Sequence, residues 1–406
     1  MSEDVKKIRI EDYDYPLPEE RIARFPLPER DASKLLIARP GEGFQHSIFS
    51  EIDRYLPEST YLVFNETKVV QARLLFPKNE TTTIEVFCLE PLPGIDIQQA
   101  MATRQSIEYI CLVGGARKWK SGSLEISLPG GSQLQAEKRE SREGTFRIGF
   151  SWSGEHTFAE VLELAGKTPL PPYLKRAAEE VDRERYQTVF AQNDGSVAAP
   201  TASLHFTRPL LKRLAQKGIE HGKLTLHVGA GTFKPVESEK IGAHEMHAEE
   251  VFISKGFVEN IYQRLHQKII PVGTTAMRAL ESLYWLGALL FKGKLAGEQG
   301  IPVLDQWIPY RDDLKGVTPE QSFEALLQYL QHQHLDTLHF KTALIIAPGY
   351  HHHICRGLLT NFHQPKSTLL LLVASMLGDN WKEMYRYALN HEFRFLSYGD
   401  ASLILL

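Results

Sequence analysis

One segment of this sequence places polar side chains between two apolar runs. Residues 358–375, LLTNFHQPKSTLLLLVAS, contain Asn361, His363, Ser367 and Thr368. The proline in this segment disfavours helix just before it, so we expect a strand, a loop and then a helix capped by Ser367 or Thr368. Such a loop presents side chains and free backbone N–H groups at one point, which is a common way to build a ligand site.

Three further segments have residue types suited to ligand binding. Residues 197–207, VAAPTASLHFT, have few charges, and His205 is suited to act as acid, base or hydrogen-bond donor. Residues 227–236, HVGAGTFKPV, contain two glycines but do not match the dinucleotide-binding pattern G-x-G-x-x-G. Residues 272–282, VGTTAMRALES, place threonines at an expected helix start and Arg278 on that helix.

The elements around these segments predict an α/β fold. From about residue 217 onward, short apolar runs alternate with breaks rich in Gly, Thr or His and with helix-like segments. This alternation is typical of an α/β domain with much parallel sheet, in which ligands gather beyond the carboxyl ends of the strands. The expected strands and breaks lie within 223–233, 268–290, 342–350 and 393–405.

Residues 72–152 have a different pattern. Short, often alternating segments separated by Gly, Pro and Ser indicate a small antiparallel barrel or sandwich. We therefore expect an inserted β domain over 72–152 and a discontinuous α/β catalytic domain over 1–71 and 153–406. Within the insert, GARKWK places cations around an aromatic ring, with the residues Arg117, Lys118, Trp119 and Lys120. This arrangement suits RNA binding, although a solvated hairpin tip is the more common reason for such a pattern.

Composition excludes several classes of protein. The chain has 406 residues, 43% hydrophobic and 24% charged, with a net charge of −4, so it is not a general nucleic-acid coat. Cys88, Cys111 and Cys355 form no C-x-x-C pair, which fits a reducing cytoplasm. The charged N-terminus is no signal peptide, and the longest apolar run, 369–374, is too short for a membrane span. We expect a cytoplasmic protein without membrane contact.

Metal and hydrolase motifs are not met. HEMHAEE at 244–250 differs from the zinc motif H-E-x-x-H, and YHHHICR at 350–356 follows a Pro-Gly break, where neighbouring histidines point in different directions. The sequence has no G-x-S-x-G elbow and no Walker sequence. We therefore expect no metal site.

Taken in order, the segments resemble one known family. RDASKLLI, NETKVVQARL, TPLPPYLKR, DRERYQTVF, VAAPTASLHFT, HVGAGTFKPV, HAEE, VGTTAMRALES, TNFHQPKSTL and YGDASLIL match landmarks of the S-adenosylmethionine:tRNA ribosyltransferase-isomerases. The resemblance runs from about residue 13 to 405. It implies an α/β barrel-like main domain with an inserted small antiparallel β-barrel domain.

The resemblance also implies an activity. Enzymes of this family act late in queuosine biosynthesis, a tRNA modification. They transfer the ribosyl moiety of S-adenosylmethionine to a 7-aminomethyl-7-deazaguanine base in tRNA, isomerise it to give epoxyqueuosine, and release adenine and methionine. The implied partners are a tRNA with a queuosine-type anticodon and S-adenosylmethionine, which is a co-substrate. No permanently bound cofactor is implied, and we expect a monomer.

Roles can be assigned to the matching residues as hypotheses. A sulfonium acidifies the adjacent C5′ proton, so a histidine can start the reaction by removing it. We favour His205 and His363 as this base over His227 and His247. The sugar, the base and the methionine carboxylate would be bound by short polar, aromatic or cationic side chains and a helix N-terminus; these are Tyr173, Tyr186, Thr201, Thr232, Thr274, Arg278, Asn361, Phe362, Ser367, Thr368 and Asp400.

Some positions differ from the family pattern. Ser203 replaces a usual Gly, Ala343 an Asp, Arg356 an acidic residue and Ser402 a Met. Losing two acids and gaining a cation would alter the electrostatics of a sulfonium or amine site. These differences suggest a somewhat divergent member, and two alternatives stay open. One is a paralogue that uses S-adenosylmethionine on a small-molecule acceptor, and the other is a non-catalytic tRNA-binding protein.

Overall fold

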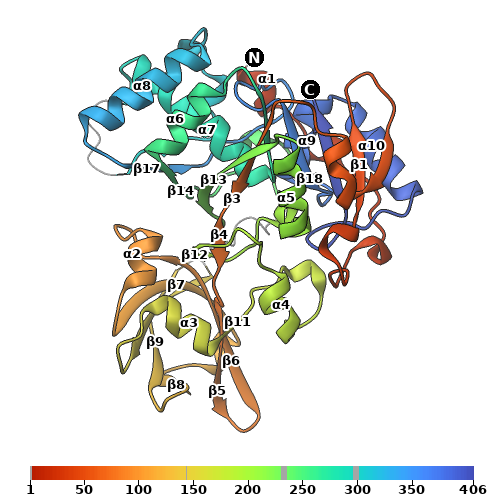
Figure 1. Ribbon diagram of the computed structural model, residues 1–406. Coiled ribbons are helices and arrows are strands. Elements are labelled where there is room, and N and C mark those ends of the chain that lie inside the picture. Colours follow the sequence, from red (N-terminus) through yellow and green to blue (C-terminus); the bar gives the residue numbers. More distant parts are fainter. Residues whose placement is uncertain (1, 143, 230–235, 296–300) are drawn as a thin grey trace.

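The computed structural model describes residues 2–142, 144–229, 236–295 and 301–406 (Figure 1). An α/β region fills the upper half of the view, and an antiparallel sheet flanked by two short helices lies below it. The chain passes from the first region to the second directly after residue 65, near the middle of the picture.

Two sheets form the α/β region. Their strands are β1 (Lys34–Ala38), β2 (Gln45–Ile48), β3 (Thr60–Asn65), β13 (Glu220–His227), β14 (Glu249–Ser254), β15 (Lys268–Pro271), β16 (Val303–Leu304), β17 (Thr337–Thr342), β18 (Gly357–Asn361) and β19 (Ala401–Leu405). One sheet has the order β15-β3-β13-β14-β17-β16, and the other has the order β18-β19-β1-β2. Both contain parallel and antiparallel pairs, which confirms the predicted α/β class.

The two sheets meet between β15 and β18. An isolated parallel bridge pairs Val272 with Leu359, and β3 is parallel to both β13 and β15. The carboxyl ends of β13, β15 and β18 therefore point to the same side of the molecule. Ligand sites form at such edges because the chain leaves each strand there in a loop or a helix N-terminus.

Helices cover these sheets. They are α1 (Ser2–Lys6), α5 (Arg208–Gln216), α6 (Lys255–Gln263), α7 (Thr274–Phe291), α8 (Pro319–His332), α9 (Thr368–Leu377) and α10 (Asn380–Asn390). Most of α7 is buried, and a Cβ on Gly287 would lie 2.3 Å from the carbonyl oxygen of Ser322, so the close packing of α7 on α8 requires glycine there. Within the described ranges, no helix combines the length and apolar character that a membrane crossing needs.

The lower sheet is antiparallel throughout. Its strands are β5 (Arg73–Asn79), β6 (Thr82–Pro91), β7 (Ser106–Gly114), β8 (Ser123–Ser127), β9 (Gln133–Arg142), β10 (Thr145–Trp152) and β11 (Gly166–Lys167), in the order β11-β5-β6-β7-β10-β9-β8. The sheet curls so that β5 contacts β8 without pairing with it. The predicted antiparallel β region is thereby confirmed as a sheet.

This sheet includes residues beyond the expected boundary at 152. Strand β11 pairs with β5, and α3 (Phe158–Ala165) buries Phe158, Val161 and Leu162 in the same apolar core as the strands; α2 (Ile97–Ala102) packs against α3. The alternating strand pattern ends at 152, whereas the apolar face of α3 continues the core. The short parallel pair of β4 (Thr67–Val69) and β12 (Asn193–Ser196) and the helix α4 (Glu180–Arg185) lie beside the junction of the two regions (Figure 1).

Candidate active site

A cavity lies at the carboxyl ends of β13, β15 and β18, and we call it the His363 cavity. Val228, Gly273 and Asn361, which stand at or just beyond these ends, line it together with the first residues of α9. The strand ends thus supply the lining that the sequence pattern predicted. Many of the predicted site residues lie together here, namely Tyr173, Tyr186, Thr201, Thr274, Asn361, Phe362, His363, Ser367 and Thr368.

Ser367 is the residue that caps α9. Its Oγ accepts a hydrogen bond from the backbone N–H of Leu370 at 3.3 Å and donates one to the carbonyl oxygen of Gln364 at 2.8 Å. Lys366, with φ of 55°, turns the chain into the helix, and its ammonium group lies 2.9 Å from a carboxylate oxygen of Glu11. The helix N-terminus therefore faces the cavity with backbone N–H groups that have no acceptor inside the helix.

His363 is held firmly at the edge of its cavity. Nε2 of the ring lies 3.1 Å from Oγ1 of Thr360, and the backbone N–H donates to the hydroxyl of Tyr385 at 3.0 Å. The hydroxyl of Tyr15 donates to the carbonyl oxygen of His363. Burial lowers the pKa of His363 to about 3. The imidazole is therefore neutral near pH 7, as a proton acceptor must be.

The three predicted aromatic residues have different environments. The hydroxyl of Tyr173 lies 2.5 Å from Oγ of Ser397, and burial raises the pKa of Tyr173 to about 12. Tyr186 is buried, and its hydroxyl has no hydrogen-bond partner among the described residues. The ring of Phe362 instead packs in the core, 4.9 Å from the ring of Phe395, so stacking of Phe362 on a ligand has no support.

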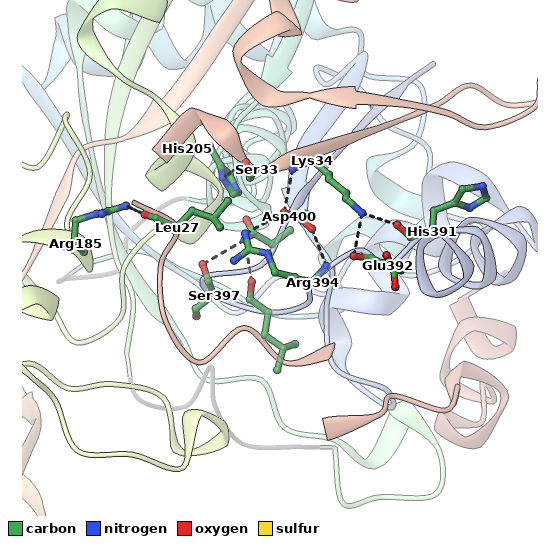
Figure 2. A network of polar contacts seen from close by, with 12 residues as sticks. Leu27, Ser33, Lys34, Arg185, His205, His391, Glu392, Arg394, Ser397 and Asp400 are labelled. Atoms are coloured by element: carbon green, nitrogen blue, oxygen red, sulfur yellow. Dashed lines mark hydrogen bonds and ion pairs between the residues drawn. The ribbon is translucent and has the colours of Figure 1, made fainter. Parts of the chain in front are cut away.

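His205 lies outside the His363 cavity, at the end of the 3-10 turn Thr201–His205. Nδ1 of the ring is 2.8 Å from Oγ of Ser33. Figure 2 shows the two side chains next to each other. Burial lowers the pKa of His205 to about 4, although the Asp400 carboxylate and the Asn361 side chain favour the protonated ring. His205 lies near Asn361, and Nε2 of the ring and Oδ1 of Asn361 are buried without a hydrogen-bond partner among the described residues.

Asp400, just before β19, joins β1 to the segment around Arg394 rather than lining a cavity. Its Oδ1 accepts from the backbone N–H of Lys34 at 3.0 Å, and its Oδ2 accepts from the backbone N–H of Arg394 at 2.7 Å (Figure 2). The guanidinium of Arg394 adds a hydrogen bond at 3.1 Å. Because β1 and β19 are parallel and β19 pairs with β18, this carboxylate fixes the edge where Asn361 stands.

A second cavity, which we call the His227 cavity, lies between the antiparallel sheet and strands β13, β14 and β17. It measures about 520 Å³, compared with about 110 Å³ for the His363 cavity, and Val228 lines both. His227, Glu249 and Glu250 line it on the α/β side. The two cavities are therefore neighbours, separated at β13 by a single residue.

Arg278 stands between the cavities but lines neither of them. Its guanidinium lies 2.8 Å from the carboxylate of Glu249, and both side chains are buried. Arg278 was predicted to contact substrate directly, and the structure instead shows it paired with an acid that lines the His227 cavity. One turn earlier on α7, Thr274 lines the His363 cavity.

Comparison with known proteins identifies the family. The family model described as "Queuosine biosynthesis protein" matches residues 10–404. An S-adenosylmethionine:tRNA ribosyltransferase-isomerase of Halothermothrix orenii is 36% identical over 403 residues, covering 98% of this chain and 100% of the relative. The protein of the same name from Syntrophotalea carbinolica is 37% identical over 403 residues, with 98% and 100% covered. The chain belongs to this family.

A solved structure is similar as well. The crystal structure of an S-adenosylmethionine tRNA ribosyltransferase from Thermotoga maritima matches 97% of this chain and 100% of that chain, with 26% sequence identity and a TM-score of 0.46. The family membership that the sequence motifs predicted is confirmed by the relatives, which match along nearly the whole chain.

The residues that depart from the family pattern lie outside both cavities. Ala343 is in the core, and Oγ of Ser402 donates to the carbonyl oxygen of Thr360 at 3.2 Å. The guanidinium of Arg356 donates to the carbonyl oxygens of His352 and His353, each at 3.1 Å. Ser203 is buried. Since none of the four lines the His363 or the His227 cavity, the differences do not change the side chains that face a ligand there.

The remaining predicted residues are scattered. Arg117, Lys118 and Lys120 lie at the surface turn between β7 and β8, whereas Trp119 is fully buried and donates its indole N–H to the carbonyl oxygen of Gly122 at 2.9 Å. Trp119 therefore has no accessible ring face for a base, which corrects the stacking prediction. His247 is exposed and lines neither cavity. Thr232 lies outside the described residues.

One buried charge cluster near the His363 cavity was not predicted from the sequence. The carboxylate of Asp182 is fully buried and accepts two hydrogen bonds from Arg176 at 2.7 Å each and one from the hydroxyl of Tyr398 at 2.8 Å. Burial acts to raise the pKa of Asp182, but hydrogen bonds from Arg176 and its other partners hold it below its usual value. The only signal was that Asp182, Arg176 and Tyr398 fall inside the blocks that matched the family. Among the described residues, no group of three His, Cys, Asp or Glu side chains is placed to share a metal ion.

Proposed function

We propose that this chain transfers and isomerises the ribosyl moiety of S-adenosylmethionine onto 7-aminomethyl-7-deazaguanine in tRNA, forming epoxyqueuosine and releasing adenine and methionine. The family membership supports the reaction. The observation that carries the proposal to this chain is the His363 cavity, where most of the predicted substrate-binding residues gather at the carboxyl ends of three strands. S-adenosylmethionine is a co-substrate in this account, and no resident cofactor takes part.

S-adenosylmethionine extends into the His363 cavity in this proposal, and the cavity, of about 110 Å³, holds only part of the molecule. Its carboxylate binds at the N-terminus of α9, where Ser367 caps the helix and the helix dipole favours an anion. The ribose hydroxyls meet short polar side chains, Thr201, Thr274 and Asn361 among them. The buried hydroxyl of Tyr186 supplies a further hydrogen bond to the nucleoside.

His363 is the base that removes the C5′ proton. Of the four histidines that the sequence offered, it is the one that lines the cavity assigned to S-adenosylmethionine. Its neutral imidazole has an acceptor nitrogen, and the low exposure of the site keeps water from competing for the proton. His205 acts as a positioning residue that holds Asn361, whose Nδ2 also donates to the carbonyl oxygen of Leu396 at 3.0 Å.

The two regions of the molecule have different roles in this proposal, one in catalysis and one in tRNA binding. We place catalysis in the discontinuous α/β domain, predicted over residues 1–71 and 153–406. We assign the curled, barrel-like insert, predicted over 72–152 and extended by α3 and β11, to contact with a tRNA that has a queuosine-type anticodon. Arg117, Lys118 and Lys120, at the surface turn of that insert, suit phosphate contacts. The protein works as a monomer in the cytoplasm in this account.

A small-molecule acceptor is the less favoured alternative. A change of acceptor would require different side chains at the positions that contact the acceptor. The departures from the family pattern, at Ser203, Ala343, Arg356 and Ser402, lie away from both cavities. A non-catalytic tRNA-binding protein is disfavoured because the His363 cavity keeps its polar lining.

Adenine release from S-adenosylmethionine tests the proposed function. The protein is incubated with S-adenosylmethionine and with tRNA carrying the aminomethyl-deazaguanine, with the same tRNA carrying guanine, or without tRNA. Adenine should appear only with the modified tRNA, together with a mass gain on its nucleoside. Folded protein that binds S-adenosylmethionine but releases no adenine with the modified tRNA would contradict the proposal.

A further inference from the structure

The roles assigned so far leave the larger cavity without an occupant. The His227 cavity, of about 520 Å³, lies within the size range of small-molecule sites. Its walls come from both regions of the molecule, because Ile97 and Arg147 belong to the insert and His227, Glu249 and Glu250 to the α/β region.

His227 presents an unsatisfied buried atom at this cavity. The side chain is 5% exposed, its Nδ1 lies 2.9 Å from Oγ1 of Thr67, and its Nε2 has no hydrogen-bond partner among the described residues. A buried polar atom without a partner destabilises the folded protein, so a ligand that satisfies it gains free energy on binding. In the tautomer whose Nδ1–H donates to Oγ1 of Thr67, Nε2 is left as an acceptor.

The imidazole ring of His227 is packed closely against the backbone at Gly195. A Cβ on Gly195, whose φ is +143°, would lie 3.0 Å from Nδ1 of His227 and 2.7 Å from Cγ1 of Ile97. The edge of the ring also meets the ring of Phe252, with 5.7 Å between the centroids. The ring is therefore fixed between β12, β13 and β14, with its orientation set by Thr67.

Carboxylates and cations both line the cavity around His227. Glu250 pairs with Lys341 at 2.8 Å and accepts the backbone N–H of Ile97 at 3.1 Å, and Glu249 is paired with Arg278. Burial acts to raise the pKa of Glu250, but hydrogen bonds from His339 and Lys341 hold it at about 2. Burial lowers the pKa of His227 to about 4, so its ring stays neutral near pH 7. An acceptor nitrogen on His227, with the Glu250 carboxylate beside it on the same wall, complements a ligand that carries an amine.

The position of the cavity limits what that ligand does. Val228 lines the His227 cavity and the His363 cavity, so a group in one is adjacent to a group in the other. Group transfer requires donor and acceptor to approach to about 3–3.5 Å. An amine acceptor in the His227 cavity is next to a sulfonium donor in the His363 cavity and would direct its amine past Val228 toward that donor.

We propose that the His227 cavity is the acceptor subsite, which binds an amine-bearing purine-like base, with Nε2 of His227 accepting a hydrogen bond from the aminomethyl group. The inference rests on the proposed function and adds the place of the acceptor to it. His227 is a binding residue in this account and Thr67 is a positioning residue.

Binding of an anticodon stem-loop tests this inference without turnover. Two stem-loops, one with 7-aminomethyl-7-deazaguanine and one with guanine at the same position, are titrated into the wild type and three variants. The wild type should prefer the modified stem-loop by about tenfold or more, the size of one hydrogen bond to a charged group. His227→Gln should lose this preference and keep its affinity for S-adenosylmethionine, and Thr67→Val should lose part of it. His221→Gln, an exposed position at the other end of β13, should keep it.

The outcomes separate the two proposals. If His227→Gln and Thr67→Val both keep the wild-type preference, or if His227→Gln weakens S-adenosylmethionine binding instead, the subsite is wrong. Melting temperatures of all variants show that the comparison is made between folded proteins. Failure of the wild type to release adenine contradicts the proposed function and leaves the binding preference as a separate result.

Discussion

The guanidinium of Arg278 and the carboxylate of Glu249 form a buried ion pair, with 2.8 Å between Nη2 and Oε2. The pair joins the first turns of α7 to the start of β14. It lies between the residues that line the two cavities, since Thr274 faces one and Glu249 the other. The charges therefore fix the geometry between the proposed donor and acceptor sites.

Removing the cation of this pair should destabilise the protein strongly. Arg278→Met leaves a buried carboxylate without its guanidinium, and breaking a buried pair typically costs about 3–5 kcal/mol. Urea denaturation measures the free energy of unfolding. The double variant Arg278→Met, Glu249→Gln should lose less than the sum of the two single losses. Strictly additive losses would show that the two side chains do not act as a pair.

Asp182→Asn should lower stability in a pH-dependent way. The native pKa of Asp182 lies below its unfolded value, so the carboxylate contributes stability above about pH 4 that is lost as pH falls through the native pKa. We expect a loss of about 3 kcal/mol at pH 7, because the amide leaves Arg176 poorly paired. Denaturation at pH 7 and pH 3 should show the gap between variant and wild type shrinking in acid. A gap that is the same at both pH values would contradict this account.

His205 should make the folded state sensitive to mild acid. The unfolded imidazole binds a proton below about pH 6.5, whereas burial lowers the folded pKa to about 4, so stability falls as pH drops from 6.5 to 4. His205→Gln should reduce the slope of unfolding free energy against pH by up to about 1.4 kcal/mol per unit in that window. Chemical denaturation at several pH values measures the slope, and an unchanged slope would show that His205 is not buried in its neutral form.

Ser367→Ala should affect both stability and the binding of S-adenosylmethionine. Loss of the cap of α9 costs about 1 kcal/mol. The KM for S-adenosylmethionine should rise while the KM for modified tRNA stays close to the wild-type value, because the helix N-terminus is assigned to the methionine carboxylate. Ser367→Asp restores a capping oxygen but adds a negative charge, so it should recover stability and bind S-adenosylmethionine even less well. Recovery of both properties would argue against a carboxylate at this position.

The sequence correctly predicts the secondary structure that surrounds the site. Pro365, the apolar runs on each side and Ser367 predict the strand, loop and capped helix found at 358–377. Alternation of strands and helices likewise predicts that the polar breaks stand at carboxyl ends of strands. These features depend on short-range sterics and hydrophobic periodicity, which a single sequence contains.

The direction of individual side chains depends on long-range pairing and is harder to predict. Asp400 binds the backbone of Lys34 across the parallel pair of β1 and β19, and nothing local to either residue indicates that contact. Phe362 and Asn361 are neighbours in extended chain, so their side chains point to opposite faces and only one of them reaches the amide network. Trp119 has cationic residues on both sides in the sequence, but its ring packs in the core of the antiparallel sheet. Packing against strands that are distant in the sequence decides this orientation.

The central claim is that S-adenosylmethionine reacts in the cavity beside His363, and adenine release by His363→Gln tests it most directly. The measurement uses saturating S-adenosylmethionine and modified tRNA, with the melting temperature of each protein recorded in parallel. Loss of a general base typically lowers the rate about 10²–10⁴-fold, so we expect a fall of at least about 100-fold with a melting temperature within a few degrees of the wild type. A folded His363→Gln variant that releases adenine at the wild-type rate would contradict the account.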